Sequence, residues 1–223
     1  MAELDGPRLE PGSGHARHLV IFLHGYGADG NDLIDIGRAW QSLLPDAAFV
    51  SPHAPRPCGQ APMGREWFPL TFRNPEERWT GVNQAAPVLE SFIDTELKRR
   101  NLPSTAVALV GFSQGTMMSL HVGLRRPVAP AGIVGYSGML VMPENIAPDT
   151  FAAEIRSRPP VLLIHGDADP LIPVQALFHA AQGLAALGVP VEWHTSAGIG
   201  HGIDQEGLRQ GGEFLRKCFA SRK

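Results

Sequence analysis

Short apolar runs alternate with longer amphipathic stretches along the chain. Six runs are rich in aliphatic and β-branched residues, and they cover 18–24, 47–51, 106–111, 131–137, 160–165 and 191–195. Most of these runs are continuous rather than alternating, which is typical of strands that helices cover on both faces. The runs therefore predict the strands of a mostly parallel central sheet.

Amphipathic stretches between these runs predict helices at 31–44, 83–100, 113–126, 174–187 and 203–220. The stretch 83–100 has the clearest pattern, because its apolar residues form one stripe and its charges lie opposite. Strand and helix alternation of this kind predicts an α/β fold with right-handed crossovers. A chain of 223 residues without an internal repeat or a linker-like stretch fits one domain.

Two segments depart from this pattern. Residues 1–17 hold several acidic residues and no apolar core of a secretory signal, so we expect a loosely ordered N-terminal leader before a single domain at 18–223. Residues 52–82, here called the strap loop, carry six of the 20 prolines and no sustained period. Long loops of this kind are often functional.

The strap loop also carries a large apolar load: Trp67, Phe68, Leu70, Phe72 and Trp79. Two interpretations of these side chains stay open. They either wall an apolar groove or pin the loop to the core. As a group they favour the groove.

Composition and charge narrow the function. A net charge of −3 and a pI near 6.3 give no support for binding nucleic acid or an anionic membrane through the overall field. The apolar runs are far shorter than the ~18 residues of a membrane-spanning helix. Cys58 and Cys218 stand alone and far apart in the sequence, which favours reduced thiols and a cytoplasmic location. The histidines lack paired ligand spacing, so no metal site is expected.

The stretch G-F-S-Q-G at 111–115 directly follows the apolar run 106–111. A G-x-S-x-G pattern arises by chance in about one chain in seven of this composition, so its context has to decide. Ser113 falls at a strand-to-helix junction, as a nucleophile elbow requires. Gly111 and Gly115 would relieve crowding in so sharp a turn, and the following helix directs its N-terminus at the site.

A serine nucleophile needs a base and an orienting acid, which in this architecture follow it in the order acid, then histidine. The stretch H-G-D-A-D-P at 165–170 ends a predicted strand, and G-I-G-H-G at 198–202 places His201 after the last one. Of the two aspartates, Asp169 is the better orienting acid, because the loop needs a few residues to curl back towards His201. Asp167 is then expected to cap the loop by bonding backbone N–H groups.

The oxyanion of a tetrahedral intermediate needs N–H donors. One comes from Gln114, which follows the nucleophile. The loop H-G-Y-G-A-D-G at 24–30 follows the first predicted strand, and Tyr26 is our candidate for the second N–H. We expect His24 and His165, at the ends of two strands, to bond backbone groups, and His121 to be packed inside.

Taken together, H-G-Y-G-A-D-G, S-P-H-A-P, G-F-S-Q-G, H-G-D-A-D-P-L-I-P and the late G-H resemble the phospholipase/carboxylesterase family of α/β-hydrolases. The resemblance runs in order from about residue 18 to 218. It implies an α/β-hydrolase fold, the triad Ser113, Asp169 and His201, and the oxyanion donors Tyr26 and Gln114. It further implies an acyl groove for the substrate, formed by Met63, Trp67, Phe68 and Leu171.

The resulting expectation is a serine carboxylesterase that hydrolyses short- to medium-chain esters through an acyl-enzyme, without a cofactor. Its expected partner is a small acyl-ester substrate, with no nucleic acid and no stable membrane insertion, and a homodimer is left open. Acyl-protein thioesterase or lysophospholipase activity at the same site is the alternative. A hydrolase of dienelactone type would need a cysteine nucleophile, and neither Cys58 nor Cys218 sits at an elbow. A non-catalytic binding protein is the alternative of a different class.

Overall fold

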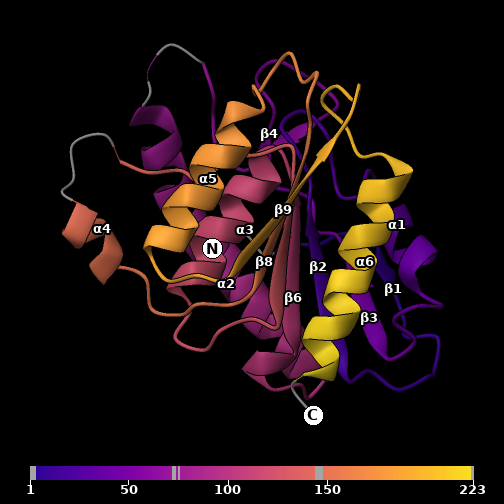
Figure 1. The fold of residues 1–223 in the computed structure, drawn as a ribbon. Coiled ribbons are helices and arrows are strands. Elements are labelled where there is room, and N and C mark those ends of the chain that lie inside the picture. The colour runs from indigo at the N-terminus through magenta and orange to yellow at the C-terminus, as the bar shows by residue number, and fades with distance from the viewer. Residues whose placement is uncertain (1–3, 72–73, 75, 144–147, 222–223) are drawn as a thin grey trace.

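A computed structural model describes residues 4–71, 74, 76–143 and 148–221, and its centre is a seven-stranded sheet (Figure 1). The strands of this sheet are, in spatial order, β1 (Arg8–Leu9), β3 (Ala47–Val50), β2 (His18–Leu23), β6 (Val107–Phe112), β7 (Gly132–Tyr136), β8 (Val161–Gly166) and β9 (Val191–Ser196). All neighbours pair in parallel except β1, which runs antiparallel to β3. The predicted mostly parallel sheet is confirmed.

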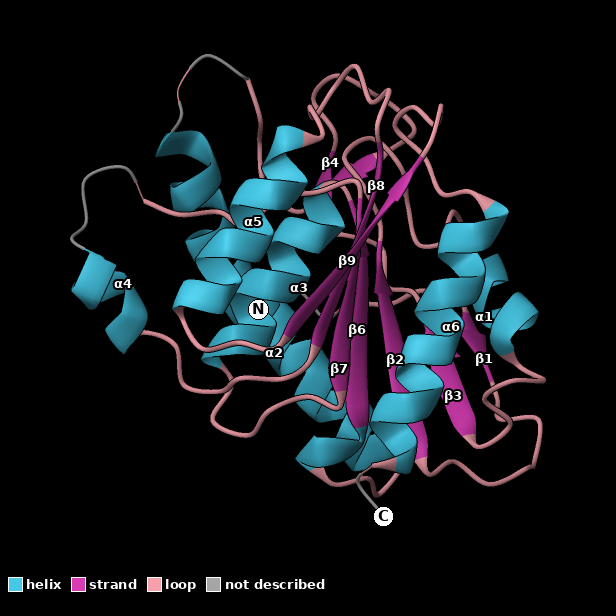
Figure 2. Cartoon of the chain, viewed as in Figure 1, coloured by secondary structure: helices cyan, strands magenta, loops and turns pink. Residues whose placement is uncertain are grey.

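Helices cover both faces of the sheet (Figure 2). They are α1 (Ile34–Trp40), α2 (Glu76–Arg99), α3 (Gln114–Arg125), α4 (Pro148–Ala153), α5 (Gln175–Ala186) and α6 (Gln205–Ala220). Helices α2, α3 and α5 lie on one side, and α1 and α6 on the other. A short 3₁₀ helix at Ser104–Ala106 leads into β6, and a separate hairpin joins β4 (Arg56–Pro57) to β5 (Arg65–Glu66).

The continuous apolar strands follow from this two-sided cover. In β2, Leu19, Ile21 and Leu23 enter the core beneath α2 and α3, while Val20 and Phe22 enter the core beneath α1 and α6. All five are completely buried, because successive side chains of a strand point to opposite faces. Because both faces of these strands are buried, their sequences lack the alternating polar residues of a half-exposed strand.

All six predicted strands and all five predicted helices are present, with shifted ends. Helix α1 is shorter than predicted, and α2 begins at Glu76, so it absorbs the last part of the strap loop. Helix α4 and the two-residue strands were not predicted. Within the described residues, no helix is both long and apolar enough to cross a membrane.

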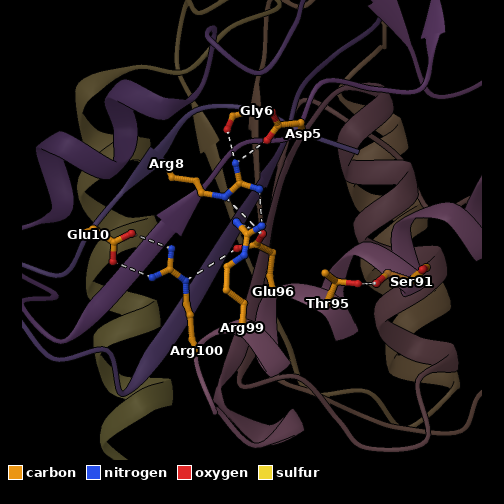
Figure 3. Close-up of polar contacts among 9 residues, drawn as sticks. All are labelled: Asp5, Gly6, Arg8, Glu10, Ser91, Thr95, Glu96, Arg99 and Arg100. Carbon is orange, nitrogen blue, oxygen red and sulfur yellow. Dashed lines mark hydrogen bonds and ion pairs between the residues drawn. The ribbon is translucent and has the colours of Figure 1, made fainter. Parts of the chain in front are cut away.

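The N-terminal segment differs from the loosely ordered leader that the sequence predicts. From residue 4 onward it packs on the domain: Leu4 is buried and β1 extends the sheet. The Arg8 guanidinium lies 2.9 Å from the buried Glu96 carboxylate on α2. Figure 3 shows how these two side chains face each other. Arg99 and Arg100 approach the same carboxylate. This ion-pair cluster fastens the start of the chain to α2.

Candidate active site

Ser113 occupies a strained turn between β6 and α3. Its φ of 53° and ψ of −113° lie in a region that non-glycine residues rarely adopt and that is commonly found at functional sites. A Cβ on Gly111 would overlap the Gly115 carbonyl, and one on Gly115 would overlap the carbonyl oxygen of Leu23. The two glycines therefore permit the sharp elbow that the motif predicts.

Asp169 and His201 are paired. Nδ1 of His201 lies 2.7 Å from Oδ2 of Asp169, whose carboxylate is fully buried. Burial alone would raise the pKa of Asp169, but hydrogen bonds from Ile172, His201 and Leu171 outweigh it and hold the pKa below its usual value. Asp169 is thus ionised at neutral pH, and Nδ1 of His201 carries the proton that it donates.

The other aspartate has the predicted capping role. Oδ1 of Asp167 accepts a 2.6 Å hydrogen bond from the N–H of Gly198, and no contact with His201 is found for it among the described residues. It thereby joins the loop after β8 to the loop after β9. The choice of Asp169 over Asp167 as the partner of His201 agrees with the structure.

The loop that carries His201 lies against the end of β6. The rings of His201 and Phe112 are 4.9 Å apart between centroids, and Phe112 directly precedes Ser113. The Ser137 hydroxyl donates to the carbonyl of Gly202 over 3.2 Å. Asp204 then caps α6 by accepting from the Gly207 N–H and from the Ser196 hydroxyl. These contacts bring His201 to the edge of the sheet where Ser113 lies.

The two candidate oxyanion donors hold equivalent positions just after two neighbouring strands. Leu23 of β2 pairs with Gly111 of β6, and Tyr26 and Gln114 each follow their member of this pair by three residues. The turn at Gly25 lies close to Ser113, because a Cβ there would be 3.4 Å from the Ser113 Cβ. Both N–H groups therefore belong to turns beside the nucleophile.

The β4–β5 hairpin of the strap loop holds the Tyr26 turn from outside. The Gly27 N–H donates to the carbonyl of Arg65 over 2.9 Å, and the Arg65 N–H donates to Ala28 over 2.8 Å. Burial, with hydrogen bonds to Cys58 and Glu66, raises the pKa of the Tyr26 phenol. The phenol thus stays neutral and is held by the same hairpin.

The four candidate groove residues divide into two pairs. Met63 is 94% exposed and Leu171 is 71% exposed, whereas Trp67 and Phe68 are each 1% exposed. Trp67 and Phe68 belong to the core cluster beneath α2 and α3. Their burial agrees with the alternative interpretation, in which they pin the strap loop. Phe72 lies outside the described residues.

Two surface hollows lie beside the loops of the site. Met63 and its neighbours form an open hollow of about 580 Å³ with the loop at 27–32. A second hollow of about 320 Å³ is lined mainly by apolar side chains of residues 139–142 and α5. Residue 139 follows Gly138, whose added Cβ would lie 2.9 Å from the Ser113 carbonyl oxygen. The sequence did not indicate this second hollow.

His24, His121 and His165 are buried, and the two at strand ends bond backbone groups, as predicted. His24 Nδ1 lies 2.8 Å from the Gly25 carbonyl, while its Nε2 accepts the Ala54 N–H. Burial lowers the pKa of His24 to about 4 and that of His121 to about 3. Nε2 of His165 lies 2.8 Å from the Ile172 carbonyl and 3.3 Å from Oδ2 of Asp169, a contact that the sequence did not predict.

The side chain of Gln114 was also missed, because the motif draws attention only to its N–H. This amide is fully buried and bonds the strap loop at Trp67 and Phe68. For cofactors, the described part of the chain contains no group of three or more His, Cys, Asp or Glu side chains placed to hold a metal ion.

Comparisons with known proteins agree with this geometry. The chain is 30% identical to an acyl-protein thioesterase 1 from Gibberella zeae, over 95% of this chain and 94% of that one. It is 28% identical to the esterase YpfH of Escherichia coli, over 90% and 83%. The crystal structure of esterase PE8 superposes with a TM-score of 0.91 at 44% identity, covering 97% of this chain and all of that one.

A family model described as phospholipase/carboxylesterase matches residues 4–219. This range includes the nucleophile elbow, the Asp169–His201 pair and both glycine-rich turns. The chain therefore belongs to the phospholipase/carboxylesterase family, whose members are hydrolases with the α/β-hydrolase fold.

Proposed function

We propose that this protein is a serine carboxylesterase that cleaves short- to medium-chain carboxylic esters through an acyl-enzyme. The observation that carries the proposal is the 2.7 Å contact between Asp169 and His201, at the sheet edge where Ser113 is held in a strained turn. An ionised acid, an oriented imidazole and a partly exposed serine hydroxyl are the parts that acyl transfer requires.

In the first half-reaction, Ser113 Oγ attacks the ester carbonyl and Nε2 of His201 takes its proton. Asp169 keeps the proton of His201 on Nδ1 and stabilises the imidazolium that forms. The C–O bond to the alcohol then breaks, and His201 gives its proton to the leaving alkoxide. In the second half-reaction, water loses a proton to His201 and attacks the acyl carbonyl. The bond between the acyl carbon and Ser113 Oγ then breaks, and His201 returns the proton to Oγ, which releases the acid and restores the enzyme.

The negative charge on the carbonyl oxygen is stabilised by the N–H groups of Gln114 and Tyr26. A preorganised donor of this kind is worth about 3 kcal/mol in the transition state. The N-terminus of α3 adds a favourable field, because its first N–H groups lack intrahelical partners. Both turns are held by hydrogen bonds or packing before substrate arrives, so little reorganisation is needed.

The acyl chain is proposed to lie against exposed apolar side chains beside the site, with Met63 and Leu171 as the candidates whose exposure suits that role. Thioester or lysophospholipid cleavage at the same site is the second candidate, favoured by the similarity to a fungal protein named acyl-protein thioesterase 1. A cytoplasmic location is proposed on the basis of the small number and wide sequence separation of the cysteines, Cys58 and Cys218.

The test compares p-nitrophenyl acetate, butyrate and octanoate as substrates for the wild type, Ser113→Ala and Ser137→Ala. Ser137 is a matched control, because it also has a positive φ and follows the next strand of the sheet. We expect Ser113→Ala alone to abolish turnover and labelling by a fluorophosphonate. Turnover that persists in Ser113→Ala would contradict the mechanism, and a wild type that binds esters without cleaving them would favour a non-catalytic protein.

A further inference from the structure

We propose that the Gln114 amide and the Trp67 indole form a clamp that sets the spacing between the two oxyanion donors. The inference rests on the proposed function, which assigns those donors to the N–H groups of Gln114 and Tyr26. The clamp consists of side chains and strap-loop backbone, so it lies outside the triad and the oxyanion N–H groups. Both side chains are positioning residues and neither touches the reacting atoms.

The first half of the clamp is the side chain of Gln114. Its Oε1 accepts a hydrogen bond from the backbone N–H of Trp67 over 2.9 Å, and its Nε2 donates to the Phe68 carbonyl over 2.8 Å. The amide is completely buried, and its two bonds fix which end carries the nitrogen. The residue that presents one oxyanion donor therefore also grips the strap loop by two hydrogen bonds.

The second half is the indole of Trp67. Its Nε1–H donates to the His24 carbonyl over 3.0 Å, and its ring centroid lies 5.6 Å from that of His24. Nε2 of the His24 ring accepts the backbone N–H of Ala54, and this bond ties His24 to the start of the strap loop. His24 and Gly25 lead directly to Tyr26, so the indole holds the backbone that presents the other donor.

These contacts form a continuous path from one donor to the other. It runs from Gln114 through its amide to Trp67, and from the indole through His24 to the Tyr26 turn. The pairing of β2 with β6 and the packing of Gly115 on the Leu23 carbonyl also link the two turns. The clamp is a further link that restricts the distance between the donors, and oxyanion stabilisation depends steeply on that distance.

Two variants break the path without touching either N–H donor. Trp67→Phe keeps one aromatic ring and removes the indole N–H together with part of the ring volume, a loss of volume that the Trp40→Phe control shares. Gln114→Met keeps much of the side-chain volume and removes both amide bonds. Because the donors are displaced rather than removed, we expect kcat to fall about tenfold in Trp67→Phe, and further in Gln114→Met, with KM changing less than twofold.

Trp40→Phe is the matched control. The Trp40 indole donates to the Leu208 carbonyl over 3.0 Å and is almost fully buried, on the opposite face of the sheet from the clamp. Both substitutions should lower the melting temperature by similar amounts, because each leaves a buried carbonyl without its donor. Only Trp67→Phe should lower kcat.

The decisive measurement is the affinity for an alkyl trifluoromethyl ketone, which forms a tetrahedral oxyanion on a serine nucleophile. Its inhibition constant should rise with Trp67→Phe by the same factor by which kcat/KM falls, and should not change in Trp40→Phe. Equal loss of melting temperature in both variants with wild-type kcat and inhibitor affinity would overturn the clamp while leaving the esterase proposal intact. A wild type without Ser113-dependent turnover would overturn both.

Discussion

The two oxygens of Asp169 serve different partners: Oδ1 accepts the N–H groups of Leu171 and Ile172, and Oδ2 accepts from Nδ1 of His201. The backbone bonds, at 2.8 and 3.0 Å, fix the plane of the carboxylate before His201 approaches it. This arrangement keeps Asp169 ionised and directs one lone pair at the imidazole. The orientation of His201 therefore depends on a short turn that belongs to a different loop.

Replacing Asp169 by Asn should lower kcat by about 10³-fold or more, because an amide can present N–H to Nδ1 and favour the wrong tautomer of His201. Asp167→Asn is the matched control in the same loop. It weakens one bond to the Gly198 N–H and should cost less than about tenfold. Steady-state kinetics with p-nitrophenyl butyrate would check both, and a larger loss in Asp167→Asn would reverse the assignment.

Replacing His165 should lower kcat without changing KM. Its Nε2–H donates to the Ile172 carbonyl and lies 3.3 Å from Oδ2 of Asp169, so it steadies the turn that orients the carboxylate. We expect His165→Phe to lose about tenfold in kcat, and His165→Gln, which keeps a side-chain N–H, to recover part of it. Equal activity of the Phe and Gln variants would show that the N–H has no positioning role.

Stability should fall in mild acid because two buried histidines resist protonation. The pKa of His24 is about 4 and that of His121 about 3, against an ordinary value of 6.5 in the unfolded chain. The unfolded state therefore binds more protons below about pH 6.5, and stability is lost as the pH falls through that window. Linkage gives a loss of about 2 kcal/mol per histidine between pH 7.5 and 5.

Urea unfolding of the wild type and His121→Gln at pH 7.5 and 5 measures this effect. The variant should lose about 2 kcal/mol of the pH dependence, because its side chain cannot take up a proton. His179→Gln, which changes an exposed histidine on α5, should leave the dependence as in the wild type. If the free energy of unfolding of His121→Gln changes between pH 7.5 and 5 as much as that of the wild type, the assignment is contradicted.

The buried Glu96 should contribute to stability but not to catalysis. Its carboxylate faces Arg8, Arg99 and Arg100, and its removal leaves these guanidinium groups without their common partner. Glu96→Gln should lower the free energy of unfolding by about 3 kcal/mol. Glu213→Gln, which breaks a partly exposed pair with Arg216, should cost less than about 1 kcal/mol. Chemical denaturation and kcat of both variants would check this, and a large drop in kcat with Glu96→Gln would be unexpected.

The central architecture could be predicted because burial on both faces leaves a continuous apolar run for each strand. The order of Ser113, Asp169 and His201 along the chain, each shortly after the end of a strand, was sufficient to predict that their loops lie at one edge of the sheet. The β1 strand could not be predicted. It has only two residues, Arg8 and Leu9, and it depends on pairing with β3 rather than on any local period.

The strap loop was harder to predict because its contacts are distant in sequence. The ring of Phe68 packs on Gly81, where a Cβ would collide with it, so its burial depends on where α2 begins. Trp67 is held by Gln114 and His24, more than 40 residues away on either side. The G-x-S-x-G motif identifies Gln114 by the role of its backbone N–H, and it carries no information about the contacts of its side chain.

The base and the tip of the β4–β5 hairpin differ in their contacts with the rest of the protein. Its base, at Arg65 and Glu66, is bonded to the turn of Tyr26, whereas the tip at 59–63 is largely exposed to solvent. Residues of the tip can therefore be varied without breaking the hydrogen bonds of the base. If Met63 contacts the acyl chain as proposed, libraries confined to 59–63 should change which acyl chains are accepted, while libraries that extend into the base should also lower turnover.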